Sequence, residues 1–193
     1  MTDAWIEVFD RVAESYDTVV PFFSSFGRLM IAELPPPAEG TRLLDVGSGA
    51  GAVALAARQR GYEVSAVDGS TAMVTRLAAT LPAVQVADAA ALPFDDAGFD
   101  VVTAGFVVHL LTDSHAALRE FKRVLTPGGL VACTVPGPLS EGSEPGDRGH
   151  ELFTEFVRHL PAEDTIVPPF DPDAALTAAG FRDVTRKHLE AES

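Results

Sequence analysis

A glycine-rich turn constrains this chain more than any other feature. The stretch from Leu43 to Gly51 reads LLDVGSGAG and is followed by an alanine-rich run of helix formers. Glycine reaches positive φ without strain, and its bare backbone lets another group approach closely. A short strand, a glycine turn and the free N–H groups of a helix N-terminus together form a typical nucleotide cradle. A tight turn that binds nothing has the same pattern.

Apolar runs alternate with helical segments from residue 41 onward, which predicts a Rossmann-like, doubly wound, mostly parallel α/β sheet with helices on both faces. The expected strands are 42–46, 63–67, 84–87, 99–104, 130–135 and 182–189. The expected helices are 5–16, 22–34, 52–60, 71–80, 114–124, 150–160 and 173–179, with a turn at 126–129 and a loop at 137–149. Such sheets bind ligands outside the carboxyl ends of their strands.

Charge and cysteine content exclude several classes of partner and site. The 193 residues suggest a single domain, and 14 Lys and Arg against 28 Asp and Glu give a net charge of −14. Nucleic acids and anionic membranes are bound by clustered basic residues, so we expect neither as a partner. The single cysteine, Cys133, excludes an internal disulfide, indicates no cysteine-based metal site, and is expected in the core. An acidic N-terminus and the lack of a membrane-length apolar run predict a cytoplasmic protein.

Three acidic residues stand at or beside the ends of successive predicted strands: Asp45, Asp68 and Asp88. In a parallel sheet they project toward one rim, where Asp68 suits the two hydroxyls of a ribose. Asp88 could accept from the exocyclic amine of an adenine, and Asp45 could orient the glycine turn or a ligand's ammonium group. Three carboxylates repel phosphate, so the pattern favours adenosine with a cationic, amino-acid-like tail. Alternatively, Asp68 is an N-cap or turn residue and Asp88 an N-cap.

These residues resemble the class I S-adenosylmethionine-dependent methyltransferases, in particular the small-molecule branch near the ubiquinone/menaquinone-biosynthesis type. The resemblance runs from about Asp10 to about Leu189. It rests on the segments LLDVGSGAG, VDGSTAM, VADAAALPF, FDVVTAGFVVHLL and REFKRVLTPGGLVACTVP. It implies S-adenosylmethionine as cofactor, an N-terminal helical cover (1–40), a cofactor-binding core (41–135), a substrate-cover insert (136–170) and a last helix and strand (171–193).

Carried over by position, the resemblance implies a cofactor site along the strand ends. The methionine end of the cofactor would be lined by Asp45, Gly47, Gly49 and Gly51 and bordered by Ala104 and Gly105. The ribose and adenine would contact Asp68, Gly69, Ser70, Met73, Asp88 and Ala89, and Tyr16 would close over the cofactor. Plain core packing is the alternative for Tyr16 and Met73.

The chain departs from the family at its C-terminal end. Members of the family usually place a seventh, antiparallel strand between strands five and six, and the sequence leaves no room for it after the last predicted strand. The chain is shortened, or a partner supplies the strand, or the edge is open. Because open edges invite pairing, a homodimer is a reasonable hypothesis.

Methyl transfer is an in-line displacement at a sulfonium, so positioning can supply most of the catalysis. His109, just past the fourth predicted strand, is the candidate general base, although it could equally pack or cap. Phe106 could form part of an apolar substrate wall or of the core.

The leading hypothesis is methyl transfer to oxygen, nitrogen or carbon of a small metabolite. The alternatives are a cofactor-binding protein of the same fold that does not methylate, such as a cyclase or partner subunit, and an NAD-linked oxidoreductase. The spacing of Gly47, Gly49 and Ala52 and the position of Asp68 support the oxidoreductase, whereas Asp88 and the turn at 126–129 oppose it.

Overall fold

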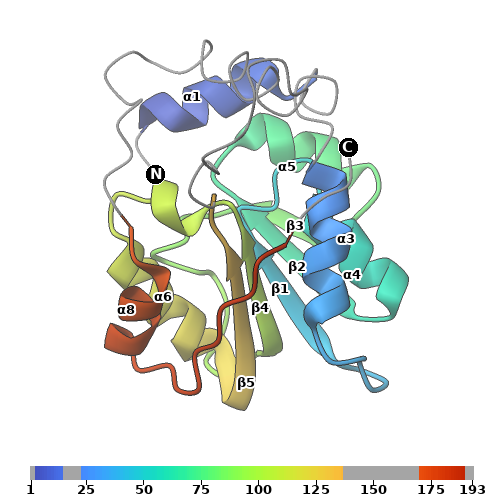
Figure 1. The fold of residues 1–193 in the computed structure, drawn as a ribbon. Helices are drawn as coiled ribbons and strands as arrows, with labels where there is room; N and C mark the ends of the chain where they lie inside the picture. The colour runs from blue at the N-terminus through green and yellow to red at the C-terminus, as the bar shows by residue number, and fades with distance from the viewer. Residues whose placement is uncertain (1–2, 15–22, 137–169, 190–193) are drawn as a thin grey trace, which may run out of the picture.

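The computed structural model describes residues 3–14, 23–136 and 170–189, and these form one parallel sheet with helices on both faces (Figure 1). The strands are β1 (Arg42–Val46), β2 (Glu63–Asp68), β3 (Val84–Val86), β4 (Phe99–Gly105) and β5 (Leu125–Thr134). The helices are α1 (Asp3–Val12), α3 (Phe23–Glu33), α4 (Ala52–Arg60), α5 (Thr71–Ala78), the 3₁₀ helix η1 (Val108–Leu110), α6 (Ser114–Val124) and α8 (Pro172–Ala178).

The sheet order is β3-β2-β1-β4-β5, and every pair of neighbours is parallel. The chain moves outward from β1 to β3, then returns to the other side of β1 to form β4. The strand order therefore reverses between β1 and β4. Open α/β sheets bind ligands at the carboxyl ends of the strands at such a switch point. The Rossmann-like prediction is therefore confirmed.

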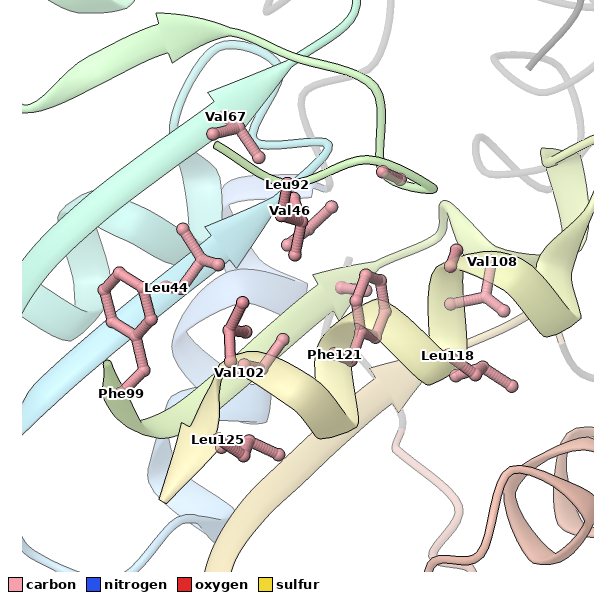
Figure 2. Packing of buried hydrophobic residues seen from close by; sticks show 14 of the residues in the cluster. Leu44, Val46, Val67, Leu92, Phe99, Val102, Val108, Leu118, Phe121 and Leu125 are labelled. Carbon is pink, nitrogen blue, oxygen red and sulfur yellow. The ribbon is translucent and has the colours of Figure 1, made fainter. Parts of the chain in front are cut away.

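Alternating side chains of the strands fill a core on each face of the sheet. Leu43 packs with α3 and α4, whereas its neighbour Leu44 packs on the opposite face in the cluster that contains α6. Phe121 and Leu118 of α6 are fully buried in that second cluster, and Figure 2 shows them with Val102 of β4. Because both faces are covered, the strands are apolar runs and not half-polar ones.

Polar side chains cap three of the helices at their N-termini. Ser70 Oγ accepts from the backbone N–H of Met73 at the start of α5, and Asp113 Oδ1 accepts from Ala116 N at the start of α6. Asp171 caps α8 in the same way. Each cap satisfies a backbone N–H that the first helical turn leaves unpaired.

The turn predicted at residues 126–129 lies within β5 as an irregularity of the strand. Phe99 pairs with Leu125, but Val101 pairs with Leu130, so β5 has more residues than β4 between the two pairs. Gly128 takes up this excess in the left-handed region, with φ +84°. Strand and turn were both predicted correctly as local features, but they belong to one element.

The strand predicted at residues 182–189 is wrong, because the structure assigns no strand there and β5 ends the described sheet. Two side chains of this segment form exposed ion pairs with neighbouring helices. Arg186 lies 3.0 Å from Asp173 at the start of α8, and Lys187 pairs with Glu33 at the end of α3. The order of strand and helix segments along the chain predicted this strand, and that order cannot show whether a neighbouring edge accepts it.

The other predicted elements agree with the structure to within a few residues where it describes them. The predicted helix at 150–160 and the loop at 137–149 lie outside the described residues. None of the described helices has the length and apolar character needed to cross a membrane. Cys133 is partly buried on β5, where burial raises the pKa of its thiol.

Candidate functional site

The glycine turn bends over the end of β2 because two successive amides of the turn share one acceptor. The N–H groups of Gly47 and Ser48 both donate to the carbonyl of Val67, at 2.8 and 3.1 Å. Gly47 and Gly51 have φ of +67° and +92°, and a Cβ there would lie 2.3 Å from Val107 and 2.5 Å from Leu77. These two glycines are required by the backbone and by close packing, whatever the turn binds.

Gly49 differs from Gly47 and Gly51 in what surrounds it. Its φ is +51°, yet a Cβ at this position would meet nothing within 4 Å. Its N–H donates to Asp68 Oδ2 at 2.7 Å. Gly49 is therefore the place where the turn offers bare backbone next to open space, as a closely approaching ligand requires.

The Asp68 carboxylate holds the glycine turn and the start of α5 at the same time. Oδ2 accepts from Gly49 N, and Oδ1 accepts from Ser70 N at 2.8 Å. Burial raises the pKa of this carboxyl, against the lowering effect of the two backbone bonds. Asp68 is therefore a turn residue, which was one of its two alternatives, and it is not the N-cap of α5, because that position is Ser70. Each carboxylate oxygen has a second lone pair, so the predicted ribose contact stays open as a prediction.

Asp45 is a buried carboxylate with one unused oxygen. It is 1% exposed, its Oδ1 accepts from Thr103 Oγ1 at 2.8 Å, and its Oδ2 has no hydrogen-bond partner among the described residues. Burial raises its pKa to about 7. The buried hydroxyl of Ser48 also lacks a partner in this part of the structure. Buried polar atoms are rarely left unpaired, so a ligand that satisfies both fits this turn.

Asp88 lies at the rim in a tight turn, and not at the start of a helix. Its Oδ1 accepts from Ala90 N at 3.0 Å, and Asp88 forms an isolated bridge with Ala91. The N-cap alternative is therefore wrong, because no helix follows. The carboxylate is exposed and Ala89 is buried, and the adenine contacts predicted for them remain predictions.

Arg123 of α6 fixes the loop that follows Asp88. Its guanidinium donates to the carbonyls of Leu92 and Phe94 at 3.0 and 2.8 Å and to both carboxylate oxygens of Glu120. Glu120 also accepts from Leu92 N at 2.8 Å. The sequence offered no signal for the contacts between this loop and α6, which join residues 28 to 31 positions apart.

The end of β4 is shaped by a residue in an uncommon conformation. Ala104 is fully buried and Gly105 half-buried, and the next residue, Phe106, has φ +57°. The Phe106 N–H donates to the carbonyl of Thr134 at 3.0 Å and to its hydroxyl at 3.1 Å, which holds this conformation. The Phe106 ring contacts Phe23 and Phe26 of α3, each at 5.3 Å between centroids. An aromatic residue at positive φ is rare, and it often marks a functional constraint.

His109 lies in η1, three residues beyond Phe106. Burial lowers the pKa of its imidazole to about 4, so the ring is neutral near pH 7. Its Nδ1 is buried and has no hydrogen-bond partner in the described part of the chain. The ring has the protonation state that a general base needs, and the geometry leaves the packing alternative open as well.

The remaining predicted site residues divide between the site and its support. Met73 is fully buried on α5, as the core-packing alternative expects, and its contact with adenine stays a prediction. Gly69 is half-buried between Asp68 and Ser70. Tyr16 lies outside the described residues. Sequence reasoning missed Ser48 and Thr103, although Thr103 could be found from its pairing opposite Asp45 in the sheet.

Comparison with known proteins gives consistent matches. Residues 44–133 match a family model described as a methyltransferase domain. The chain is 33% identical over 207 residues to a demethylmenaquinone methyltransferase of Roseiflexus castenholzii, covering 92% of this chain and 85% of the relative. It is also 33% identical over 210 residues to the nocamycin O-methyltransferase of Saccharothrix syringae, covering 96% of this chain and 75% of that protein.

A solved structure shares the fold across nearly the whole chain. It is a SAM-dependent methyltransferase of Thermotoga maritima, described as a possible histamine N-methyltransferase. The TM-score is 0.67 at 20% identity, and the match covers 92% of this chain and 81% of the other.

The buried Asp45 carboxylate predicts a specific dependence of stability on pH. The folded protein retains its proton up to about pH 7, whereas the unfolded chain releases it near the ordinary pKa of 3.8, so stability falls as pH rises through this window. Asp45→Asn keeps an acceptor for Thr103 and removes this slope. We therefore compare the unfolding free energy of Asp45→Asn with that of wild type. As the pH rises from about 4 to about 8, we expect this difference to change by roughly 3 kcal/mol in favour of the variant.

Urea denaturation at several pH values measures this shift, with Asp100→Asn as the control because Asp100 accepts from Arg42 N where β1 and β4 begin. A difference between Asp45→Asn and wild type that stays constant with pH would contradict the buried, proton-retaining carboxyl.

Proposed function

Since this chain belongs to the class I S-adenosylmethionine-dependent methyltransferases and transfers a methyl group from S-adenosylmethionine to a small molecule, we propose that the donor is held over the carboxyl ends of β1, β2 and β4. The residues proposed to hold it are Tyr16, Asp45, Gly47, Gly49, Gly51, Asp68, Gly69, Ser70, Met73, Asp88, Ala89, Ala104 and Gly105. The observation that carries this proposal is a pair of buried oxygens that have no partner among the described residues, Asp45 Oδ2 and Ser48 Oγ, within four residues of Gly49, where a Cβ would meet open space.

The chemistry of these groups fits the donor's methionine end. The unused oxygen of Asp45 would accept from the ammonium group, which would favour the charged carboxylate and offset its burial. The Ser48 hydroxyl would bond a second polar group of the same tail. The bare backbone of Gly49 would let the tail approach, and the free lone pairs of Asp68 would accept from the ribose hydroxyls.

When bound, the donor would supply a methyl carbon on a sulfonium, to which the acceptor bonds in line as the carbon–sulfur bond breaks and S-adenosylhomocysteine leaves with the electron pair. The residues of this chain then act mainly by position, because holding two reactants in contact and in line removes much of the barrier. Phe106 and η1 lie next to the glycine turn, since Val107 fills the space above Gly47. We place the acceptor on this side, with neutral His109 as the group that takes its proton where the acceptor carries one.

The acceptor is proposed to be a small, largely apolar metabolite. The aromatic contacts of Phe106 with Phe23 and Phe26 support an apolar border at the end of β4. Two relatives are described by name as acting on demethylmenaquinone and on nocamycin, which agrees with an acceptor of this kind. Whether oxygen, nitrogen or carbon receives the methyl group is decided by the assay below.

We further propose that the protein is a cytoplasmic homodimer that binds neither nucleic acid nor membranes. We propose that each chain is a single domain with a helical cover (1–40), a cofactor-binding core (41–135), a substrate-cover insert (136–170) and a last part (171–193). The net charge of −14 supports the exclusion of polyanions. The position of β5 at the end of the described sheet supports pairing between copies. We expect sedimentation velocity to show a species of twice the chain mass of 20.3 kDa, and a monomer at all concentrations would contradict the dimer.

Asp68→Ala tests the donor site directly. It removes the proposed ribose contact together with the anchor of Gly49, so we expect S-adenosylhomocysteine to bind about 10- to 100-fold more weakly by calorimetry. Wild type should bind this ligand and form it from S-adenosylmethionine in the presence of phenols, amines or polyketide-like acceptors. NAD should not bind.

Asp100→Ala is the matched control, because Asp100 binds the backbone of β1 at the opposite end of the sheet. It should reduce stability and leave donor affinity unchanged. Equal donor affinity in wild type and Asp68→Ala would refute the ribose assignment. Donor binding without product from any acceptor would favour the non-methylating alternative.

His109→Ala tests the general base. For an acceptor that loses a proton, we expect kcat to fall by about 10²- to 10⁴-fold with donor affinity unchanged. Because the imidazole pKa lies at about 4, wild-type kcat/KM for the acceptor, measured with the donor saturating so that Asp45 is already engaged, should rise through this pH and stay level above about pH 5. His115→Ala, an exposed histidine on α6, is the control. If His109→Ala leaves kcat unchanged, the imidazole has a packing role and is not the general base.

A further inference from the structure

Helix α1 is tied to α5 by two polar contacts that are far apart in the sequence. Asp10 Oδ1 accepts from Ser70 Oγ and from Ala72 N, the latter at 3.2 Å. Arg76 donates to the carbonyl of Ala13 just beyond α1. Val8 is fully buried, so the helix is also seated by apolar packing. Figure 1 shows α1 beside α5, at the end of the sheet where the strands terminate.

The hydroxyl of Ser70 has one proton to donate, and Asp10 receives it. Ser70 Oγ accepts from Met73 N at 3.1 Å, so the hydroxyl is used as acceptor and as donor at once. Ser70 is fully buried, whereas Asp10 is exposed, so the bond between them is partly exposed. Asp10 therefore adds a second cap to α5, supplied by a different helix, and a carboxylate at this helix end is electrostatically favourable.

The same serine connects Asp10 to the glycine turn. Ser70 N donates to Asp68 Oδ1, and Asp68 Oδ2 accepts from Gly49 N. Asp10 therefore reaches the turn through Ser70, which bonds Asp10 with its hydroxyl and Asp68 with its backbone N–H. Asp68 is the group to which we assign the donor's ribose, and Asp10 holds the residue whose N–H bonds this carboxylate.

We propose that Asp10 is a positioning residue of the donor site, which seats α1 on the N-terminus of α5 and thereby couples the seating of α1 to donor binding. The inference rests on the proposed function, since the coupled ligand is the donor. Coupling between two equilibria is reciprocal: a ligand at Asp68 stabilises the seated helix, and loss of the seat weakens the ligand by the same factor. A residue that only supports the fold would alter stability and leave this linkage intact.

The test uses S-adenosylhomocysteine as an unreactive probe and reads both ends of the series. Calorimetry gives its Kd, and hydrogen exchange gives the protection of the amides of residues 3–14 with and without the probe. In wild type we expect the probe to slow exchange in this segment. In Asp10→Ala we expect Kd to rise about three- to tenfold, as for a partly exposed hydrogen bond to a charged group, and the slowing to disappear.

Two further variants separate the hydrogen bond from general effects. Asp10→Asn keeps an oxygen that can accept from Ser70 and Ala72, so it should retain both the affinity and the slowing. Glu7→Ala removes an exposed carboxylate from the same helix and should behave as wild type. Slowing that persists in Asp10→Ala with wild-type Kd would overturn the inference, as would an Asp10→Asn protein that behaves like Asp10→Ala. Failure of the probe to bind wild type would instead refute the donor site itself, and the inference with it.

Discussion

The hydrogen bond from Gly49 N to Asp68 Oδ2 is the contact on which the candidate site depends. It joins the turn after β1 to the end of β2, while the other oxygen of the same carboxylate holds the start of α5. One side chain therefore sets the relative positions of a turn, a strand end and a helix N-terminus. Because Asp68 is buried, water competes little for these bonds, which hold the turn with its left-handed glycines in place.

The site combines rigid support with polar groups that the fold leaves incomplete. Gly47 and Gly51 are enclosed by Val107 and Leu77, and Arg123 fixes the loop after Asp88. Against this support, Asp45 and Ser48 each keep a buried oxygen without a partner in the described structure. A buried polar atom left unpaired costs about 1–3 kcal/mol, so these atoms reduce stability in a way that a bound ligand can reverse. The unpaired oxygen of Asp45 therefore destabilises the fold, and in the proposed site it is the group that binds the donor's ammonium.

Sequence reasoning was strongest where local pattern and chemistry coincide. The five described strands, the glycine turn and the convergence of Asp45, Asp68 and Asp88 on one rim all follow from apolar runs and parallel topology. It failed where a partner decides the outcome. No strand forms at 182–189, where Arg186 and Lys187 pair with acids of α8 and α3, and Asp88 lies in a tight turn closed by Ala90 N and by a bridge to Ala91.

The sequence by itself determined the fold class, the position of the turn and the acidic rim, since periodicity, glycine sterics and strand order are properties of short stretches of chain. Only the tertiary structure decided how those groups are used. Contacts between residues dozens of positions apart set three features of the site. They decide which oxygen of Asp45 has no partner in the described structure, hold Phe106 at positive φ through Thr134, and bring Asp10 to Ser70. Burial and hydrogen-bond pairing depend on all neighbours in space, and no local pattern encodes them.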